Sequence, residues 1–344
     1  MTLPPQKFIN PRARHHFKSR TCSIAGVGSY LPERVLTNYD LGKMVDTSDE
    51  WITSRTGIKE RRLAAKHQHT SDLAAAAALA AMKNAHVTAD QLDLIIIATI
   101  TPDMPFPSTA CVVQRKISAC HAAAFDIEAA CSGFLYALEI GQHFIMAHTA
   151  DTVLVIGADK LSSIVNWKDR NTCVLFGDGA GAAVLRNRPN AHGLLTTCMG
   201  SDGTKGDMLC MPGGGSQCPP TPHSLATGMH YLRMDGKETF KNAVNAMHFA
   251  ASEALRRCAT HIRHIKCVIP HQANRRIIDA VADRLGATPQ QVFTNLEKYG
   301  NTSAASVAIA LDEAVQQGRI QKGDLILLIA FGAGLTWAAA VIEW

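Results

Sequence analysis

Residues 126–138 read Asp-Ile-Glu-Ala-Ala-Cys-Ser-Gly-Phe-Leu-Tyr-Ala-Leu, and this stretch bears on both the fold and the chemistry of the chain. Its first residues end a short strand-forming run, and its last residues begin an apolar helical pattern. Cys131 lies between them, in a turn of small residues. A strand that leads through a turn into a helix is the repeating unit of α/β folds, so the stretch predicts layered α/β structure with Cys131 at a helix N-terminus.

The same alternation of strands and helices recurs along the chain. An Ala-rich stretch at 72–84 predicts a helix, for which Ser71 and Asp72 make a plausible cap. We expect strands at 94–100, 124–127, 152–156, 181–185, 267–269 and 325–330. The pattern indicates helices that cover mostly buried sheets.

A weak repeat relates the two halves of the chain. Cys131 follows the strand residue Ile95 by 36 positions, and Asn301 follows Cys267 by 34 positions. Asn301 lies in Gly-Asn-Thr-Ser-Ala-Ala-Ser, which is again a small-residue turn before an apolar helix. The repeat predicts two duplicated α/β halves, with Cys131 and Asn301 near a pseudo-twofold axis. A chance match between Gly- and Ala-rich segments is the alternative.

Composition divides the chain into four segments. Residues 1–20 are a basic leader, because no Asp or Glu occurs before position 33. This leader could be disordered, follow from a misassigned start, or pack on a dimer, whereas its prolines argue against an amphipathic transit peptide. Residues 21–190 and 230–344 are the two expected halves. The connecting region, 191–229, contains an uncharged Pro- and Gly-rich loop at 211–228.

The overall composition is that of a globular protein. Hydrophobic residues make up 47% and charged residues 18% of 344, which excludes an acidic disordered chain. A net charge of +5 is too small to indicate nucleic-acid binding, but it suits an anionic partner. No secretory signal and no run of about 18 apolar residues occurs, so we expect a cytoplasmic protein without a membrane partner. Ten scattered cysteines show no zinc spacing, so we expect no metal.

Three polar residues could act together in a reaction. A thiol such as that of Cys131 at a helix N-terminus is favoured as thiolate and can act as a nucleophile. His271 and Asn274 follow a strand three positions apart, and on one helical face both could donate hydrogen bonds to a developing oxyanion. Separately, Cys131 could be a buried thiol, His271 a structural histidine and Asn301 a helix cap. Together they can form a thioester and stabilise an enolate.

These segments, taken with three others, match a family. The further segments are 37–58, with Ser-Asp-Glu-Trp-Ile-Thr-Ser-Arg-Thr-Gly-Ile at its end, 176–185, Phe-Gly-Asp-Gly-Ala-Gly-Ala-Ala-Val-Leu, and 332–337, Gly-Ala-Gly-Leu-Thr-Trp. From about Ser23 to Trp344 the chain resembles β-ketoacyl-acyl-carrier-protein synthase III of the thiolase superfamily. The resemblance implies a five-layered thiolase-like fold of two duplicated α/β halves, assembled as a homodimer.

The resemblance also implies a reaction. Cys131 would take an acyl group from acyl-CoA, and His271 with Asn301 would assist decarboxylation of malonyl-acyl-carrier protein. The product would be a 3-ketoacyl-acyl-carrier protein, with no metal or redox cofactor. The oxyanion formed on acylation would use the backbone N–H of Cys131 and one from the loop 331–334, where Ala333 replaces a glycine usual in the family.

Substrate contacts are carried over in the same way. Trp51 and Arg170 would hold the adenine of CoA between them, with Arg55 and Thr47 nearby. The pantetheine tunnel would be lined by Phe240, Ala243 and Asn274. The acidic carrier protein would dock on Lys241 and Arg276, with Arg284 as a further candidate. Phe106 would cap the acyl pocket across the dimer interface. Asn171 replaces a frequent glycine beside Arg170.

Two other functions fit parts of the sequence. A related ketosynthase of secondary metabolism could use the same three residues on other acyl groups, and only the unusual Pro-rich loop favours it. A catalytically silent subunit would be expected to have lost Cys131 or His271. This chain keeps both residues. The length and branching of the acyl primer depend on packing that the sequence does not reveal.

Overall fold

The computed structural model describes residues 20–188 and 193–344. The leader expected at 1–20 therefore lies outside the described residues, except for Arg20. That residue is fixed to the body of the molecule, because its guanidinium donates to the carbonyl of Ala150 (2.9 Å) and pairs with Asp151 (2.8 Å).

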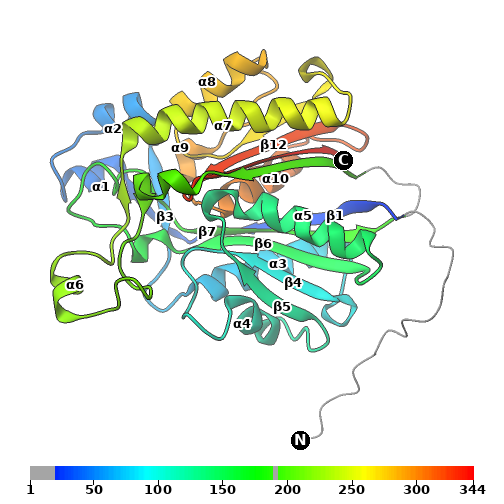
Figure 1. Ribbon diagram of the computed structural model, residues 1–344, viewed down its shortest axis with the longest axis horizontal. Helices are drawn as coiled ribbons and strands as arrows, with labels where there is room; N and C mark the ends of the chain where they lie inside the picture. Colours follow the sequence, from blue (N-terminus) through cyan, green and yellow to red (C-terminus); the bar gives the residue numbers. More distant parts are fainter. Residues whose placement is uncertain (1–19, 189–192) are drawn as a thin grey trace, which may run out of the picture.

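Two sheets form the framework (Figure 1). The first has the order β1-β7-β6-β4-β5. Its strands are β1 (Cys22–Tyr30), β4 (Leu94–Ala98), β5 (Ala123–Ile127), β6 (Thr152–Asp159) and β7 (Gly179–Asn187). The second has the order β11-β12-β13-β8. Its strands are β8 (Leu194–Ser201), β11 (Cys267–Pro270), β12 (Leu325–Gly332) and β13 (Thr336–Glu343).

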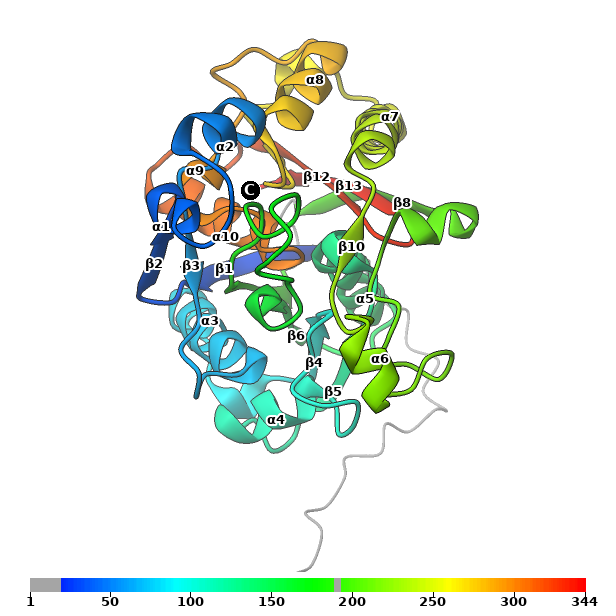
Figure 2. The same ribbon diagram turned by 90° about the vertical axis from the view of Figure 1, so that its left-hand side faces the viewer.

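Helices cover both sheets and fill the space between them, which gives five layers (Figure 2). The outer helices are α3 (Thr70–Ala85) and α4 (Thr109–Lys116) on the first sheet, and α7 (Gly236–Arg257) and α8 (Arg275–Leu285) on the second. The central layer is α5 (Gly133–Met146) and α10 (Ala305–Gln316). The largest apolar cluster joins this layer to both sheets. The expected layered α/β architecture is confirmed.

The two sheets repeat one topology. In the first, β4 pairs parallel with β6, which pairs antiparallel with β7, and β7 with β1. In the second, β11, β12, β13 and β8 follow the same sequence of pairings. The counterpart of β5 is reduced to one parallel bridge between Val268 and Val292. The duplication read from the sequence is therefore present, although one edge of the second sheet is shortened.

The remaining helices and strands are short and lie outside the two sheets and the central layer. One group precedes α3: β2 (Arg34–Thr37), α1 (Asn38–Gly42), α2 (Asp49–Thr56) and β3 (Glu60–Leu63). Another lies between β8 and α7: η4 (Gly203–Met208), β9 (Leu209–Cys210), α6 (Pro222–Ala226) and β10 (Arg233–Met234). The remainder are η1 (Ala89–Gln91), η2 (Ala130–Ser132), η3 (Leu161–Ser163), η5 (Ile262–His264) and α9 (Leu296–Tyr299). The uncharged loop 211–228 is thus an excursion between the paired strands β9 and β10.

Three expectations differ from the structure. The connecting region was expected to begin at 191, but 194–201 form β8, which pairs with β13 of the second sheet, so the connection begins after this strand. The cap of α3 is His69, because the Asp72 carboxylate accepts the backbone N–H of His69 at the start of the helix. Helix α8 begins at Arg275, so His271 and Asn274 do not share a helical face.

Candidate active site

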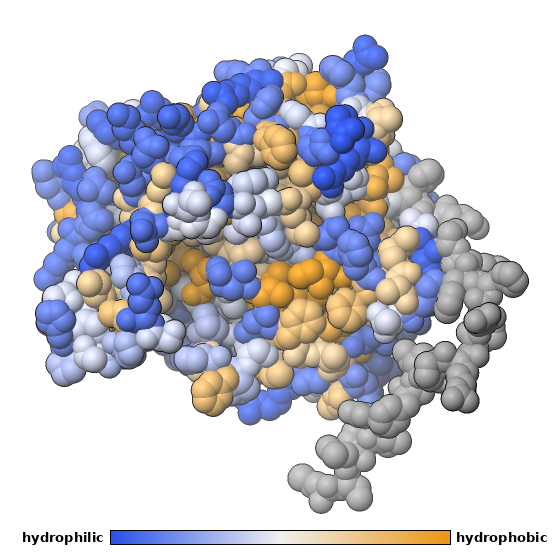
Figure 3. Space-filling model, viewed as in Figure 1, coloured by the Kyte–Doolittle hydropathy of each residue, from blue (hydrophilic) through white to orange (hydrophobic). Residues whose placement is uncertain are grey.

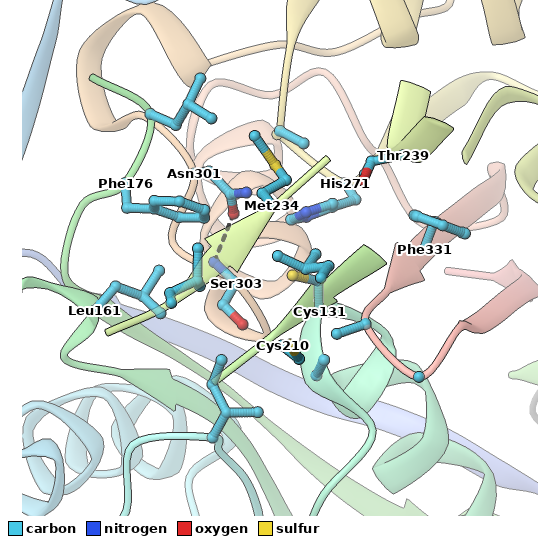
Figure 4. A pocket seen from close by; sticks show the side chains of 18 of the residues that line it. Cys131, Leu161, Phe176, Cys210, Met234, Thr239, His271, Asn301, Ser303 and Phe331 are labelled. Carbon is cyan, nitrogen blue, oxygen red and sulfur yellow. Dashed lines mark hydrogen bonds between the residues drawn. The ribbon is translucent and has the colours of Figure 1, made fainter. Parts of the chain in front are cut away.

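A cavity of about 1290 Å³ opens between the two halves. Its lining includes Cys131 before α5, His271 after β11 and Asn301 before α10. Figure 4 shows the three side chains around the same space. Because the helix starts of both halves meet at the centre of the molecule, residues 170 positions apart in the sequence become neighbours in one cavity.

Cys131 lies in η2, two residues before α5, and only 7% of its surface is exposed. Burial raises the pKa of its thiol to about 12, and the Asp159 carboxylate adds to the rise, while the hydroxyl of Ser303 opposes it. Burial therefore opposes the stabilisation of the thiolate that we expect from the helix N-terminus.

His271 is held as a neutral imidazole. It is 4% exposed, and burial lowers its pKa to about 3. Its backbone N–H donates to the carbonyl of Ile329 (2.7 Å), and its Nδ1 lies 2.5 Å from the hydroxyl of Ser306. The other ring nitrogen, Nε2, remains for a group in the cavity. A neutral imidazole can donate one hydrogen bond without adding charge to the site.

Asn301 is fixed through its carbonyl oxygen. This oxygen accepts the backbone N–H of Ser303 at 2.8 Å, the bond drawn in Figure 4. Backbone bonds to Leu175 (2.8 Å) and from Gly177 (3.0 Å) hold the Asn301 segment against the β6–β7 connection. Since the oxygen is occupied, the amide nitrogen is the part of the side chain that can donate to a ligand.

A close backbone approach joins the end of β12 to Cys131. A Cβ at Gly332 would lie 2.6 Å from the Cys131 backbone nitrogen, so only glycine fits there. Gly334 has φ 129°, which also favours glycine, whereas Ala333 has no positive φ. The departure from the family at Ala333 therefore falls on the loop position that does not need glycine.

The outer end of the cavity carries the expected aromatic and basic residues. Trp51 and Arg55 line it, and the guanidinium of Arg55 lies 4.7 Å from the Trp51 ring centroid. Arg170 lies 4.9 Å from the same ring and donates to the carbonyl of Asp46 (2.7 Å). Trp51 and Arg170 are thus in direct contact. An adenine ring held between them would need a separation of ~7 Å between the guanidinium and the Trp51 ring.

The three residues expected along a pantetheine tunnel line the same cavity as Cys131. Phe240 and Ala243 come from α7, and Asn274 caps α8. The Asn274 side chain accepts the backbone N–H of Arg276 (2.9 Å) and donates to the carbonyl of Arg55 (3.1 Å). Asn274 therefore ties α8 to α2 at the tunnel wall.

Five predicted residues lie outside the cavity lining, and Arg170, described above, is one of them. Lys241 and Arg276 are exposed beside it, with the Arg276 guanidinium 5.8 Å from the Phe240 ring centroid. Thr47 is half-buried, and Phe106 is 84% exposed. Asn171 lines the cavity without a positive φ, so its backbone does not call for glycine.

Several lining residues were not singled out from the sequence. Ser303 has φ 51° in a buried site, where a non-glycine residue with this conformation is unusual. Apolar side chains around Cys131 complete the wall: Leu161, Phe176, Cys210, Leu232, Met234 and Phe331. A periodic core pattern does not distinguish such residues from ordinary buried ones. Only the serines of the segment 300–306 could have been noticed, as polar residues before an apolar helix.

Comparisons with known proteins identify the family. A β-ketoacyl-[acyl-carrier-protein] synthase III from Caldanaerobacter subterraneus subsp. tengcongensis is 58% identical over 321 residues, which are 93% of this chain and 97% of the relative. The chain belongs to the 3-oxoacyl-[acyl-carrier-protein] synthase III family. Two family models match, 3-Oxoacyl-[acyl-carrier-protein (ACP)] synthase III at 125–203 and its C-terminal part at 255–344.

Solved structures agree on the fold. A 3-oxoacyl-[acyl-carrier-protein] synthase III from Aquifex aeolicus VF5 has a TM-score of 0.87 and 49% identity, covering 94% of this chain and all of its own. A priming β-ketosynthase from the R1128 polyketide pathway has a TM-score of 0.89 and 34% identity, covering 96% of this chain and 98% of its own. The predicted family, thiolase-like fold and class of condensing acyltransferase are confirmed.

Two further observations concern metal ligands and membrane-spanning helices. Within residues 20–188 and 193–344, no group of three or more His, Cys, Asp or Glu side chains is placed to hold a metal ion. None of the helices in the same ranges is both long and apolar enough to cross a bilayer. The expectation of a reaction without cofactor stays a prediction.

Proposed function

We propose that the cavity joins an acyl-CoA primer to malonyl-acyl-carrier protein, with Cys131, His271 and Asn301 as the reacting and stabilising groups. The observation that carries the proposal is one cavity that holds a buried thiol and two neutral hydrogen-bond donors and is also lined by Trp51 and Arg55. The confirmed family starts fatty acid synthesis by this type of condensation.

The first half-reaction transfers the primer. The Cys131 sulfur attacks the thioester carbonyl carbon, the bond from that carbon to the CoA sulfur breaks, and CoA leaves as the thiol with the Cys131 proton. The tetrahedral oxyanion is placed beside the Cys131 backbone N–H, where Gly332 allows the β12 loop to approach. The Cys131 thiol must lose its proton for attack, because the thiolate is the nucleophile.

The second half-reaction forms the carbon–carbon bond. Malonyl-acyl-carrier protein loses CO₂, and the electron pair of the broken bond forms an enolate whose oxygen accepts from His271 Nε2–H and the Asn301 amide. The enolate carbon then attacks the acyl carbonyl, and the bond to Cys131 breaks. Both donors are neutral, so neither removes the charge that drives the attack.

Binding of CoA at the outer end requires Arg170 to move. In the described conformation its guanidinium lies against Trp51 and is held by Asp46. We therefore expect the adenine to replace this contact, with Arg170 closing over the opposite ring face. Thr47 and Arg55 are assigned to the same end, and Lys241 with Arg276 to docking of the acidic carrier protein.

A homodimer is proposed on the surface of the first sheet. The sheet ends at β5, and Phe125 of this edge strand contacts Phe144 of α5 (6.5 Å between ring centroids). Apolar side chains gather over the region of α5 on the face drawn in Figure 3. Phe144 and Met146 of α5 are exposed. Burial of this face against a second copy, with Phe106 reaching across, fits its exposure. A cytoplasmic location stays a prediction.

A second candidate is a priming ketosynthase of secondary metabolism. The fold match to the R1128 polyketide ketosynthase favours it, at lower identity than the fatty acid relatives. Both functions share the acyl-cysteine step, so the primer distinguishes them. The uncharged loop reaches the cavity through Cys210 and Met211, which line it at the base of the loop. These two residues are where the loop could affect the choice of primer.

The test is the intact mass of the protein after incubation with acyl-CoAs of increasing length and branching, repeated with Cys131→Ala. We expect a gain of one acyl group that is absent in the variant. The ranking of the acyl-CoAs gives the primer. Mass gain from an acylated carrier protein but from no acyl-CoA would contradict the proposed priming role and favour an elongating or specialised synthase.

A further inference from the structure

Ser306 lies beneath His271 without reaching the cavity. It is in the first turn of α10 and is 1% exposed. Its hydroxyl has two partners among the described residues, the Nδ1 atom of His271 at 2.5 Å and the backbone N–H of Gln272 at 3.4 Å. A buried hydroxyl with these two partners has few ways to place its single proton.

The donor count at Ser306 separates two arrangements. A hydroxyl carries one proton and two lone pairs, and the Gln272 N–H occupies one lone pair. If the hydroxyl donates to His271 Nδ1, every group is satisfied and the imidazole proton is on Nε2. If instead Nδ1–H donates to the hydroxyl, the Ser306 proton is left without an acceptor in a buried site, which is unfavourable.

The neighbouring residue cannot turn to relieve this second arrangement. The Gln272 side chain accepts the backbone N–H of Asn295 (3.0 Å) and donates to the carbonyl of Pro270 (2.6 Å). The His271 backbone is itself bonded to β12 through Ile329. The Gln272 N–H therefore stays directed at Ser306, and the serine hydroxyl stays directed at the imidazole.

We propose that Ser306 is a positioning residue for condensation, because its hydroxyl fixes His271 as the tautomer with the proton on Nε2. In that tautomer the histidine donates to the enolate oxygen, whereas the other tautomer would present a lone pair and repel it. The inference rests on the proposed function of His271. It makes a buried serine that touches no substrate necessary for the second half-reaction and not for the first.

The test separates the two half-reactions in three variants of the full-length protein. Ser306→Ala removes the donor, Ser306→Cys keeps a weak donor of similar size, and Ser306→Thr keeps the hydroxyl. Ser23→Ala, which removes a buried serine hydroxyl of β1 away from the cavity, is the matched control. The measurements are the rate of Cys131 acylation, kcat and KM for malonyl-acyl-carrier protein, and thermal unfolding.

We expect Ser306→Ala to lower kcat of condensation by about 10- to 100-fold with KM for malonyl-acyl-carrier protein and Cys131 acylation within about 2-fold of the wild type. This loss is smaller than the ~10⁴-fold cost of a fully wrong histidine tautomer in a serine protease. Ser306→Thr should restore most of kcat and Ser306→Cys part of it, so a poorly folded alanine variant does not end the test. Equal kcat in Ser306→Ala and the wild type would overturn the proposal.

The tautomer is read independently from long-range ¹H–¹⁵N spectra of protein with ¹⁵N-labelled histidine, with the His271 signals assigned by their loss in His271→Asn. We expect a protonated Nε2 in the wild type and a shift toward protonated Nδ1 in Ser306→Ala. An unchanged tautomer with reduced kcat would overturn the assignment in favour of a packing effect. A shifted tautomer in a protein that performs no condensation would support the assignment and contradict the proposed function.

Discussion

The two halves of the molecule place different chemistry in corresponding turns. In the first half, the turn before α5 carries Cys131, and in the second half the turn before α10 carries Asn301. Each turn contains a non-glycine residue with positive φ, Ala130 at 45° and Ser303 at 51°. Cys131 directly follows its positive-φ residue, whereas Asn301 precedes its own by two positions. The two turns thus share a feature of backbone conformation, while one copy supplies a nucleophile and the other supplies donors.

Burial acts on the nucleophile Cys131 and on the donor His271 in opposite directions. It raises the pKa of Cys131 to about 12 and lowers that of His271 to about 3, so both groups are neutral at pH 7. Neutrality suits a donor at once, but a nucleophile must first lose its proton. We therefore expect the first half of the molecule to control acylation and the second half to control condensation, which the following variants test.

The largest expected effect is in the first half. Cys131→Ser should lower acyl transfer from acyl-CoA by at least about 10³-fold, because a serine hydroxyl without a neighbouring base is a far weaker nucleophile. Intact mass after incubation with acyl-CoA measures it. Substantial remaining acylation would remove Cys131 from its role, and Cys111→Ser, at an exposed cysteine, is the control.

Variants of the second half should divide the reaction in the opposite way. His271→Ala or Asn301→Ala should lower condensation by about 10²–10³-fold, the usual cost of one oxyanion donor, and leave Cys131 acylation largely intact. Rates of ¹⁴CO₂ release from labelled malonyl-acyl-carrier protein and of acyl-enzyme formation measure the two steps. Lost acylation with preserved condensation from a preformed acyl-enzyme would reverse the proposed division.

The sequence predicted the layers and the duplication because both depend on periodicity, which a single chain carries. It also brought Cys131, His271 and Asn301 to one cavity, through short motifs at strand ends and helix starts. The motif gave no exact helix boundary, so Asn274 was expected on a helical face, whereas it caps α8. The role of β8 was missed because its pairing with β13 is distant in sequence.

The electrostatics of the site could not be read from the sequence. A helix start favours thiolate, but the strength of desolvation depends on how many side chains close over Cys131, and these come from both halves. The same holds for the contact of Arg170 with Trp51, whose closure depends on the position of Asp46. Residue types specify which groups meet, and packing specifies their charge state and spacing.

The outer end of the cavity should respond more weakly than its centre. Trp51→Ala should raise KM for acyl-CoA by about 10-fold, since stacking on an aromatic ring contributes about 1–3 kcal/mol. Arg170→Ala should raise it by only about 2- to 5-fold, because Arg170 already has Trp51 and Asp46 as partners and loses both on binding. Initial rates at saturating malonyl-acyl-carrier protein measure KM. A larger effect of Arg170→Ala than of Trp51→Ala would contradict this order.

The last prediction concerns stability instead of activity: burial of His271 should make the folded protein less stable in acid. Its pKa is lowered from 6.5 to about 3, so the unfolded chain binds a proton at His271 below pH 6.5 that the folded protein does not bind. The free energy of unfolding should therefore fall as the pH decreases from 6.5 toward 3, by up to about 1.4 kcal/mol per pH unit from this group. His271→Asn removes the titrating group, so urea unfolding of this variant between pH 6.5 and 4.5 should depend less on pH than unfolding of the wild type. The exposed His67→Asn variant should follow the wild type. Parallel curves for all three proteins would mean that water reaches the imidazole and that His271 is not held neutral by burial.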